Sequence, residues 1–407
     1  FSFKASYENA TIYTPKYSDI ALRNAYKDPT IKTVVDCVVK DGTKKGFEIE
    51  NLDSDIVELV QEKLKNININ EKLHDAWTDS RILGQSYILL ITNEDIANYS
   101  EELGGEDLIN ILVFTEGVTH GPIEEDLKSS NFGMPKSYSI IDSGVNFFNI
   151  HYTRICRIDG AYLTKRDLIL NNYRYESVIS KVYRSASQLG LGRRAIAPLI
   201  NAFNTKILKL QDLMDIQDIE TEENLKKRLI LTQRSQEEHN IIFLGEDDEY
   251  ENNTINLSGI DNAMGILSNA VAGDSGIPNA ILFGENVAGM NATGNLELEM
   301  YYKGVKQDQS RVLLKCITTI INQIMKYEYG KIHGYDIVFP PIKELSDIEE
   351  ADYRLKVTSS MEKYIDLGVI SSEEVRASLF ENKFSQNIKL IEGSLDLEEM
   401  PEPKLKE

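Results

Sequence analysis

The segment that most constrains this chain is the loop 276–295, which has helix-like patterns on both sides. It contains four glycines and no lysine or arginine, and it begins with the apolar residues Ile277, Ile281, Leu282 and Phe283. Long loops without secondary structure of their own are usually functional, and an apolar beginning predicts an anchored base with a mobile tip. The fold must therefore place two helices so that this loop connects them.

The glycines of this loop could also indicate a phosphate-binding loop. Such a loop needs a Gly-Lys-Ser or Gly-Lys-Thr step after a strand, and the segment 276–295 has neither. Its one carboxylate, Glu285, would also repel phosphate. The sequence therefore argues against a nucleotide-binding role for the loop.

The periodicity of apolar residues predicts a mixed α+β fold that is predominantly helical. In the first half, helices are expected at 31–39, 56–64 and 70–83, a strand at 86–92, irregular chain at 93–149, and a strand at 150–160.

The second half is expected to be mostly helical. A helix from Tyr175 should break at Gly190 and Gly192 and be followed by a second helix, 193–213. A strand, helix and strand insert precedes a helix from Ser258 to Gly273. After the loop we expect a long helix from Thr293 or Asn295, a strand at 336–339, and helices beginning at Ser346 and Ser371. The buried stripe predicted for the long helix consists of Tyr301, Val305, Val312, Leu313, Ile317, Ile320 and Ile324.

Charge is unevenly distributed along the chain. The 44 Lys and Arg against 65 Asp and Glu give a formal net charge of -21, which argues against a protein that grips nucleic acid or an anionic membrane over a broad face. Residues 160–211 nevertheless carry nine basic side chains against two carboxylates, whereas residues 215–251 carry twelve carboxylates against four basic side chains. This segregation predicts electrically distinct parts, although each block alone is equally typical of a solvated helix face.

No group of residues indicates catalysis, metal binding or a cofactor. The histidines at positions 74, 120, 151, 239 and 333 lack ligand-like spacing, and the odd set Cys37, Cys156 and Cys316 is widely separated in sequence. Adjacent carboxylates are typical of a solvated face rather than of an opposed catalytic pair. We therefore expect no enzyme, no metal site and no cofactor. Since no apolar run approaches the ~20 residues that cross a bilayer, no membrane partner is expected.

The loop and its flanks resemble one segment of the bacteriophage portal proteins, the head-tail connector family. The resemblance rests on Gly276-Ile-Pro, Leu282-Phe-Gly284, Gly289-Met-Asn-Ala-Thr-Gly294 and Tyr301-Tyr302. In that family the corresponding segment leaves the second stem helix, forms the tunnel loop and enters a long helix.

Two further segments resemble the same family and follow the same order. They are Ile150-His-Tyr-Thr-Arg154 with Asp159-Gly160, similar to the strand before the large central helices, and the segment 368–376, similar to a C-terminal helical piece. The resemblance implies a portal fold. Its expected parts are a wing (1–192, completed by the long helix and strand 297–345), a first stem helix (193–213), a clip (214–257), a second stem helix (258–274), a tunnel loop (275–296) and a short crown-like end with a disordered tail (346–407).

The resemblance also implies a function. Portal proteins assemble as rings, typically of twelve subunits, at one vertex of the virion capsid, after assembly in the host cytoplasm, and double-stranded DNA is packaged and ejected through the ring. The implied partners are further copies of the chain, the DNA, the major capsid protein, the terminase large subunit and a head-completion or adaptor protein. A DNA channel must confine the duplex without binding it, because every neutralised phosphate adds affinity, and a base-free loop in an acidic chain meets that need.

Three groups of site residues follow from this interpretation. The residues expected at the DNA-facing tip of the tunnel loop are Asn286, Val287, Met290 and Asn291. The basic stem residues, expected either to pair with a neighbouring subunit, which is favoured, or to form a basic ring facing DNA, are Arg193, Arg194, Lys206 and Lys209. The residues expected on the partner surface of the clip are Glu222, Glu223, Asp247 and Asp248.

Two alternatives remain open from the sequence. A scaffold or adaptor protein of a virus-like particle, without a channel, would share the helices and the acidity but form monomers or dimers. An unrecognised hydrolase would instead need a pocket that contains groups with perturbed pKa values.

Overall fold

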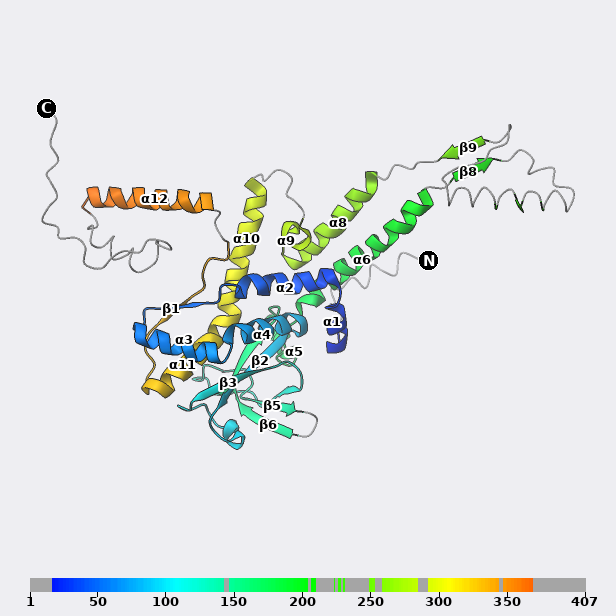
Figure 1. Cartoon of the computed structure of the whole chain (residues 1–407). Helices are drawn as coiled ribbons and strands as arrows, with labels where there is room; N and C mark the ends of the chain where they lie inside the picture. Colours follow the sequence, from blue (N-terminus) through cyan, green and yellow to red (C-terminus); the bar gives the residue numbers. More distant parts are fainter. Residues whose placement is uncertain are drawn as a thin grey trace, which may run out of the picture. The chain divides into compact units, whose positions relative to one another are not determined.

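The computed structural model describes residues 17–142, 146–203, 206–209, 223, 226–227, 230, 249–252, 258–284, 292–343 and 347–368 (Figure 1). It is mixed α+β and mostly helical, as predicted. The chain divides into two compact units, residues 1–342 and 343–407.

Four helices form the N-terminal part of the first unit: α1 (Asp19–Ala25), α2 (Pro29–Thr43), α3 (Ser54–Asn66) and α4 (Ile69–Leu83). The Asp28 side chain caps α2 by accepting hydrogen bonds from the backbone N–H groups of Thr30 and Ile31 at 2.9 and 3.2 Å. Helix α4 ends at Gly84, whose φ of 94° is one that a residue with a side chain rarely adopts. The predicted helices at 31–39, 56–64 and 70–83 are thus confirmed.

Two antiparallel three-stranded sheets follow the helices. One has the order β3-β2-β7 and consists of β3 (Leu108–Phe114), β2 (Gln85–Thr92) and β7 (Ile155–Asp159). The other has the order β4-β5-β6 and consists of β4 (Val118–His120), β5 (Ser137–Asp142) and β6 (Asn146–His151). The strand predicted at 86–92 is therefore confirmed.

Two predictions in this region are wrong. The segment 93–149, expected to be irregular, contains a 3-10 helix (Ile96–Ser100) and four strands or parts of strands. These elements are short and gain their stability from pairing with distant strands, so their own sequence pattern is weak. The strand expected at 150–160 is two strands in different sheets, because the 3-10 turn Tyr152–Arg154 separates them.

Helix α6 (Val178–Phe203) is unbroken and passes through both Gly190 and Gly192, so the predicted break is wrong. Glycine costs a helix about 1 kcal/mol relative to alanine, but here tertiary packing decides. Helix α6 lies beside α8 (Ser258–Ser275), and a Cβ atom on Gly192 would come within 2.8 Å of Leu267 Cδ1. Gly192 therefore permits a close approach of two helices.

The bounds predicted for the helix 193–213 are also wrong at both ends. It is the last part of α6, which begins at Val178 and ends at Phe203. Residues Lys206–Lys209 instead form strand β8, which pairs antiparallel with β9 (Glu249–Asn252). Pairing with β9, in which Ile207 lies opposite Glu251 and Leu208 opposite Tyr250, selects the strand conformation here. Most of the expected strand, helix and strand insert lies outside the described residues.

The loop between α8 and the following helix is shorter than predicted, because α9 (Asn279–Phe283) occupies part of it. Helix α10 (Ala292–Asp308) then continues through a π-helical turn (Gln309–Leu313) into α11 (Leu314–Tyr329). The amide of Gln309 donates a 2.7 Å hydrogen bond to the carbonyl of Gly42, which joins this turn to α2. All seven residues of the predicted stripe are buried, which confirms the predicted face of the long helix.

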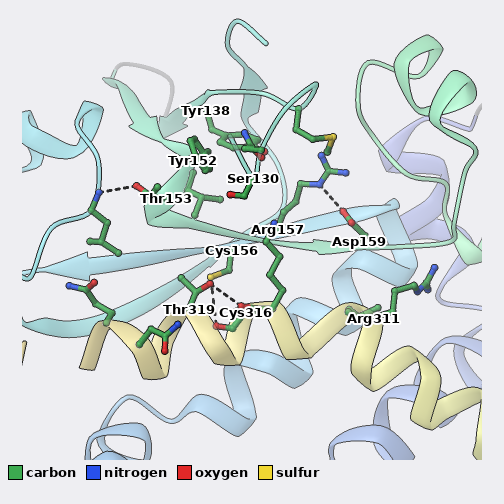
Figure 2. Close-up of a pocket in the computed structure, with 18 of the residues that line it drawn as sticks. Ser130, Tyr138, Tyr152, Thr153, Cys156, Arg157, Asp159, Arg311, Cys316 and Thr319 are labelled. Atoms are coloured by element: carbon green, nitrogen blue, oxygen red, sulfur yellow. Dashed lines mark hydrogen bonds and ion pairs between the residues drawn. The ribbon is translucent and has the colours of Figure 1, made fainter. Parts of the chain in front are cut away.

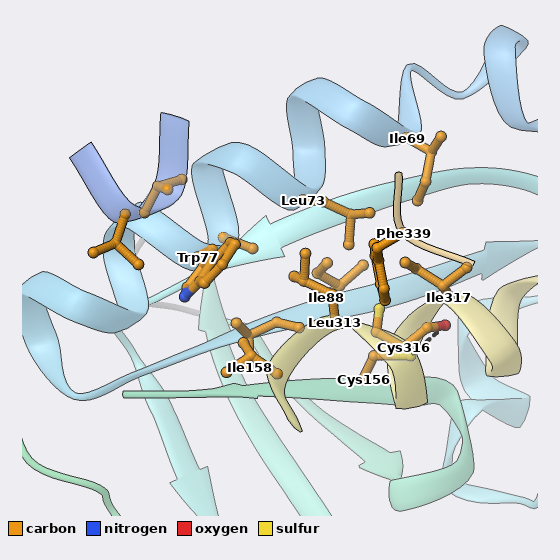
Figure 3. Packing of buried hydrophobic residues seen from close by; sticks show 14 of the residues in the cluster. Ile69, Leu73, Trp77, Ile88, Cys156, Ile158, Leu313, Cys316, Ile317 and Phe339 are labelled. Carbon is orange, nitrogen blue, oxygen red and sulfur yellow. Dashed lines mark hydrogen bonds between the residues drawn. The ribbon is translucent and has the colours of Figure 1, made fainter. Parts of the chain in front are cut away.

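The main core lies where α4 and α11 pack against the β3-β2-β7 sheet (Figure 3). Trp77 of α4 is 1% exposed and contributes to the same cluster as Ile88, Ile158 and Ile317. Strand β10 (Asp336–Val338), which falls where a strand was predicted, pairs with β1 (Glu48–Glu50). Elements far apart in the sequence therefore form one core in the first unit.

The described part of the second unit consists of helix α12 (Asp347–Asp366), which is followed by Gly368 at a φ of 67°. The helix predicted to begin at Ser346 is confirmed. The helix predicted from Ser371 and the expected disordered tail lie outside the described residues.

Candidate functional site: the α6–α8 pair and the segment leading to α10

Helices α6 and α8 run side by side in opposite directions (Figure 1). Their contact includes Gly192, Leu267 and Met264, because a Cβ on Gly192 would lie 3.3 Å from the Met264 sulfur as well as close to Leu267. Val182 on α6 and Val271 on α8 belong to the main hydrophobic core and are fully buried. The pair is therefore joined to the rest of the first unit by apolar packing.

The two helices present opposite charges to solvent. Helix α6 contains no carboxylate, and its four basic side chains, all exposed, are Lys181, Arg184, Arg193 and Arg194. Helix α8 contains no basic residue, and both of its carboxylates, Asp261 and Asp274, are exposed. The exposed charged side chains of α6 are thus all basic, and those of α8 are all acidic.

The structure separates the four predicted stem residues. Arg193 and Arg194 lie on α6, whereas Lys206 and Lys209 lie on strand β8, and the side chains of these two lysines are outside the described part of the structure. Arg193 Nη1 lies 3.4 Å from Thr30 Oγ1 of α2, and its guanidinium lies 5.6 Å from the centroid of the Phe283 ring. Arg193 therefore connects α6 to the base of the predicted loop.

The base of the predicted loop, residues 277–283, is anchored as predicted. Ile277 and Leu282 are 2% and 7% exposed, and Ile281 and Phe283 pack against the same core cluster. Gly276 and Gly284 bound this anchored segment at φ values of 69° and 64°. The predicted DNA-facing residues Asn286, Val287, Met290 and Asn291 lie outside the described residues.

The predicted clip surface cannot be assembled from the described residues. Glu223 is exposed, and Glu222, Asp247 and Asp248 lie outside the described ranges.

The described residues contain no group of His, Cys, Asp and Glu that could hold a metal ion. Within the same ranges, no helix has both the length and the apolar character that a bilayer crossing requires. His74 is partly exposed with Nδ1 3.6 Å from Asp75, and burial lowers the pKa of both His120 and His151.

Two features were missed by sequence reasoning. Cys156 and Cys316 are neighbours despite their separation in sequence, and the Cys156 thiol donates to the Cys316 carbonyl at 3.9 Å. Interaction with Cys156, together with burial, raises the pKa of the Cys316 thiol. A cavity between β7 and α11 (Figure 2) was also missed. The polar and basic residues at helical spacing from Arg311 to Lys326 indicate a polar helix face, but they do not identify the strand that lies opposite it.

The chain matches a family model described as phage portal protein over residues 21–363. An uncharacterized protein of Haemophilus influenzae is 22% identical over 343 residues, which cover 83% of this chain and 76% of that protein. The anti-CBASS protein Acb1 of Caulobacter sp. is 22% identical over 315 residues, or 73% of this chain, and the match spans 50% of that protein's length.

Among solved structures, a chain from the virion of a native gene transfer agent particle has a TM-score of 0.55 and 12% sequence identity. The alignment covers 90% of this chain and 94% of that one. A chain from the neck of the native particle, computed with C12 symmetry, has a TM-score of 0.53, the same identity and the same coverage. At this level of identity the likeness shows a shared fold.

Proposed function

The chain belongs to the phage portal protein family, and we propose that its copies close into a ring around a channel through which double-stranded DNA is packaged and ejected. The observation that carries this proposal is the family match, which spans residues 21–363. The fold shared with a chain of the gene transfer agent neck, a structure computed with C12 symmetry, supports a ring of twelve copies.

The α6–α8 pair offers complementary charges for a contact between neighbouring copies. A ring needs two different, complementary surfaces on each subunit, so that each copy contacts the next in the same way. The basic surface of α6, with Arg193 and Arg194, complements the acidic surface of α8. Each surface also has an exposed apolar side chain, Leu191 at 64% and Ile266 at 69%. We therefore favour subunit pairing over a basic ring facing DNA.

The remaining site assignments follow from the same proposal. The base-free segment that carries Asn286, Val287, Met290 and Asn291 would touch the passing DNA without retaining it, because it offers no cation to the phosphates. The acidic segment that contains Glu222, Glu223, Asp247 and Asp248 would form the clip surface for the terminase large subunit and then for a head-completion protein. The major capsid protein would surround the ring at one vertex of the virion, after assembly in the host cytoplasm.

Members of this family are structural proteins, so we assign no catalytic role to the chain. The anti-CBASS activity for which two relatives are named is not transferred, since the chain spans about half the length of each.

Negative-stain electron microscopy of the purified chain tests the ring directly. We expect closed rings, and Arg194→Glu should prevent them by placing a carboxylate against the acidic surface of α8. The matched control is Lys128→Glu, which makes the same charge change at an exposed position outside α6 and α8. A second change, Asp261→Lys, should restore rings in the Arg194→Glu background. Persistent monomers or dimers of the unaltered chain would favour the scaffold alternative.

The loop assignment needs a separate test. Asn286→Lys with Asn291→Lys should slow DNA packaging in a particle assay, because each added cation increases the affinity of the channel for phosphate. The matched control, Asn286→Gln with Asn291→Gln, adds no charge. Normal packaging by the lysine variant, with rings intact, would argue against contact between this loop and DNA.

A further inference from the structure

A cavity of about 440 Å³ lies in the first unit, away from the α6–α8 pair. Its walls come from strand β7, from the loop before β5, and from the polar face of α11 with the preceding π-helical turn (Figure 2). This volume lies in the range of sites that bind small molecules or short peptide segments. The proposed portal function assigns no role to this cavity.

The most unusual group in the cavity wall is Arg157 of β7. Its side chain is 10% exposed, and its Nε donates a 2.7 Å hydrogen bond to Asp159. Both terminal nitrogens, Nη1 and Nη2, are buried without a hydrogen-bond partner. Burial raises the pKa of the Tyr138 hydroxyl, and the nearby Arg157 guanidinium lowers it. The guanidinium also lies 5.1 Å from the centroid of the Tyr175 ring. Buried donors are nearly always paired, so the two terminal nitrogens of Arg157, which form a planar fork of donors, indicate a site for an acceptor such as a carboxylate.

Three further cations line the opposite wall, on one helical run. Arg311 is already paired with Asp308 at 3.1 Å. Lys315 and Lys326 are exposed, and no ion pair of either ammonium group is found within the described ranges. With Asp159 as the one carboxylate in the lining, the cavity has a net positive charge.

The spacing of these cations distinguishes between classes of anion. Lys315 and Lys326 are eleven positions apart, which corresponds to about 16 Å along a helix at 1.5 Å per residue. Backbone positions this far apart suit two anionic groups. The two lysines can contact two carboxylates that are about five residues apart on an extended chain, which rises about 3.3 Å per residue.

The uncharged part of the lining also suits a peptide. Asn131, Asn322 and Gln323 line the cavity, and their amide side chains can donate and accept hydrogen bonds, as a peptide backbone does. Part of this capacity is already used, because the Asn131 amide donates to the Pro135 carbonyl at 2.8 Å and the Asn322 side-chain carbonyl accepts from the Tyr335 hydroxyl at 2.9 Å. The Gln323 amide already donates to the Glu106 carbonyl at 2.7 Å, which fixes its orientation.

We propose that this cavity binds an extended acidic peptide segment, with one carboxylate at the end formed by Arg157, Arg311 and Lys315 and a second beside Lys326. The inference does not depend on the portal function, since it uses a different part of the first unit. A partner protein with an exposed acidic strand or tail would present the required chemistry.

Fluorescence anisotropy with the full-length protein tests the proposal. The probe is a labelled Gly/Ser peptide with two glutamates about five residues apart, and the control peptide has glutamine at both positions. We expect binding of the glutamate peptide only, and Lys315→Gln with Lys326→Gln should weaken it by about tenfold or more. The matched control, Lys303→Gln with Lys128→Gln, removes the same charge from exposed positions outside the cavity lining and should leave binding unchanged.

A further variant, Arg157→Lys, retains the charge but removes the fork, so it should weaken peptide binding as well. Equal binding of the glutamine peptide, or an equal loss in the control variant, would overturn the proposal. Displacement of the peptide by an equimolar amount of inorganic phosphate would do the same, because it would show a site for a single anion. Ring formation, observed by negative stain on the same samples, reports separately on the portal function.

Discussion

The guanidinium of Arg193 lies 5.6 Å from the centroid of the Phe283 ring. This contact joins α6 to α9, the last described element before the predicted DNA-facing residues. The basic residue Arg193 therefore lies beside the anchored base of the loop. Arg193 therefore has a contact within its own subunit, whereas the exposed side chain of Arg194 has no ion pair or hydrogen bond among the described residues.

The Arg193–Phe283 contact should be measurable as a coupling free energy. In a double-mutant cycle of Arg193→Ala and Phe283→Ala, we expect about 0.5–1 kcal/mol of coupling, the usual size for a partly exposed cation–π pair. Urea denaturation of the two single variants and the double variant gives this value. The same cycle with Arg194→Ala should give no coupling, and equal values for the two arginines would show that the contact contributes nothing specific.

The two glycines of α6 should respond differently to alanine. Nothing lies within 4 Å of a Cβ at position 190, so Gly190→Ala should stabilise the protein by about 0.5–1 kcal/mol through helix propensity. At position 192 the new methyl group would meet Leu267 and Met264, so Gly192→Ala should lose this gain or destabilise the fold. Thermal unfolding of both variants tests the difference. An equal gain at both positions would mean that α6 and α8 do not approach closely at Gly192.

Arg154 should be one of the most sensitive positions in the first unit. Its side chain is 1% exposed, with Nη2 2.7 Å from Glu94 and Nε donating to the Glu101 carbonyl at 2.9 Å. Arg154→Ala leaves these acceptors without their buried donor and should cost about 3–5 kcal/mol of unfolding free energy. Arg166→Ala, at an exposed position of α5 (Lys165–Leu170), should change it by at most about 0.5 kcal/mol. Comparable losses in the two variants, measured by urea denaturation, would contradict a structural role for Arg154.

His120 should make stability depend on pH. Its Nε2 lies 2.7 Å from the Tyr87 hydroxyl, and burial, with a further effect from Arg157, lowers the pKa of the imidazole below its ordinary value of about 6.5. The folded state thus favours the neutral form. The contribution of His120 to stability is fully present above the pKa that this histidine has in the unfolded chain. It is lost as the pH falls from there through the lower pKa of the folded state.

Unfolding free energies at pH 7 and pH 5 test this dependence. The unaltered protein should lose more stability over this interval than His120→Gln, which has no titrating imidazole at this position. His74→Gln, at a partly exposed position, should behave like the unaltered protein. An identical decline in His120→Gln would show that other groups account for the pH dependence.

Local sequence patterns were sufficient for the elements whose own residues report burial. The stripe from Tyr301 to Ile324 is one example, because seven apolar residues at helical spacing define a buried face whatever the partner is. The end of α4 at Gly84 and the apolar base of the loop at Ile277 and Leu282 were similarly local. The loop motifs, in their order along the chain, also resemble the portal family to which the chain belongs.

Tertiary structure decided the features that depend on a distant partner. Gly192 has the same local signature as a helix break, and only its contact with Leu267 makes it part of a continuous helix. The short strands of 93–149 form because other strands satisfy their backbone hydrogen bonds, and β8 forms because β9 pairs with it. Arg157 and Lys315 come from elements more than a hundred residues apart, so no local pattern could place them in one cavity. Periodicity in a sequence records how much of each side chain is buried, whereas the identity of the group that buries it is set by long-range packing.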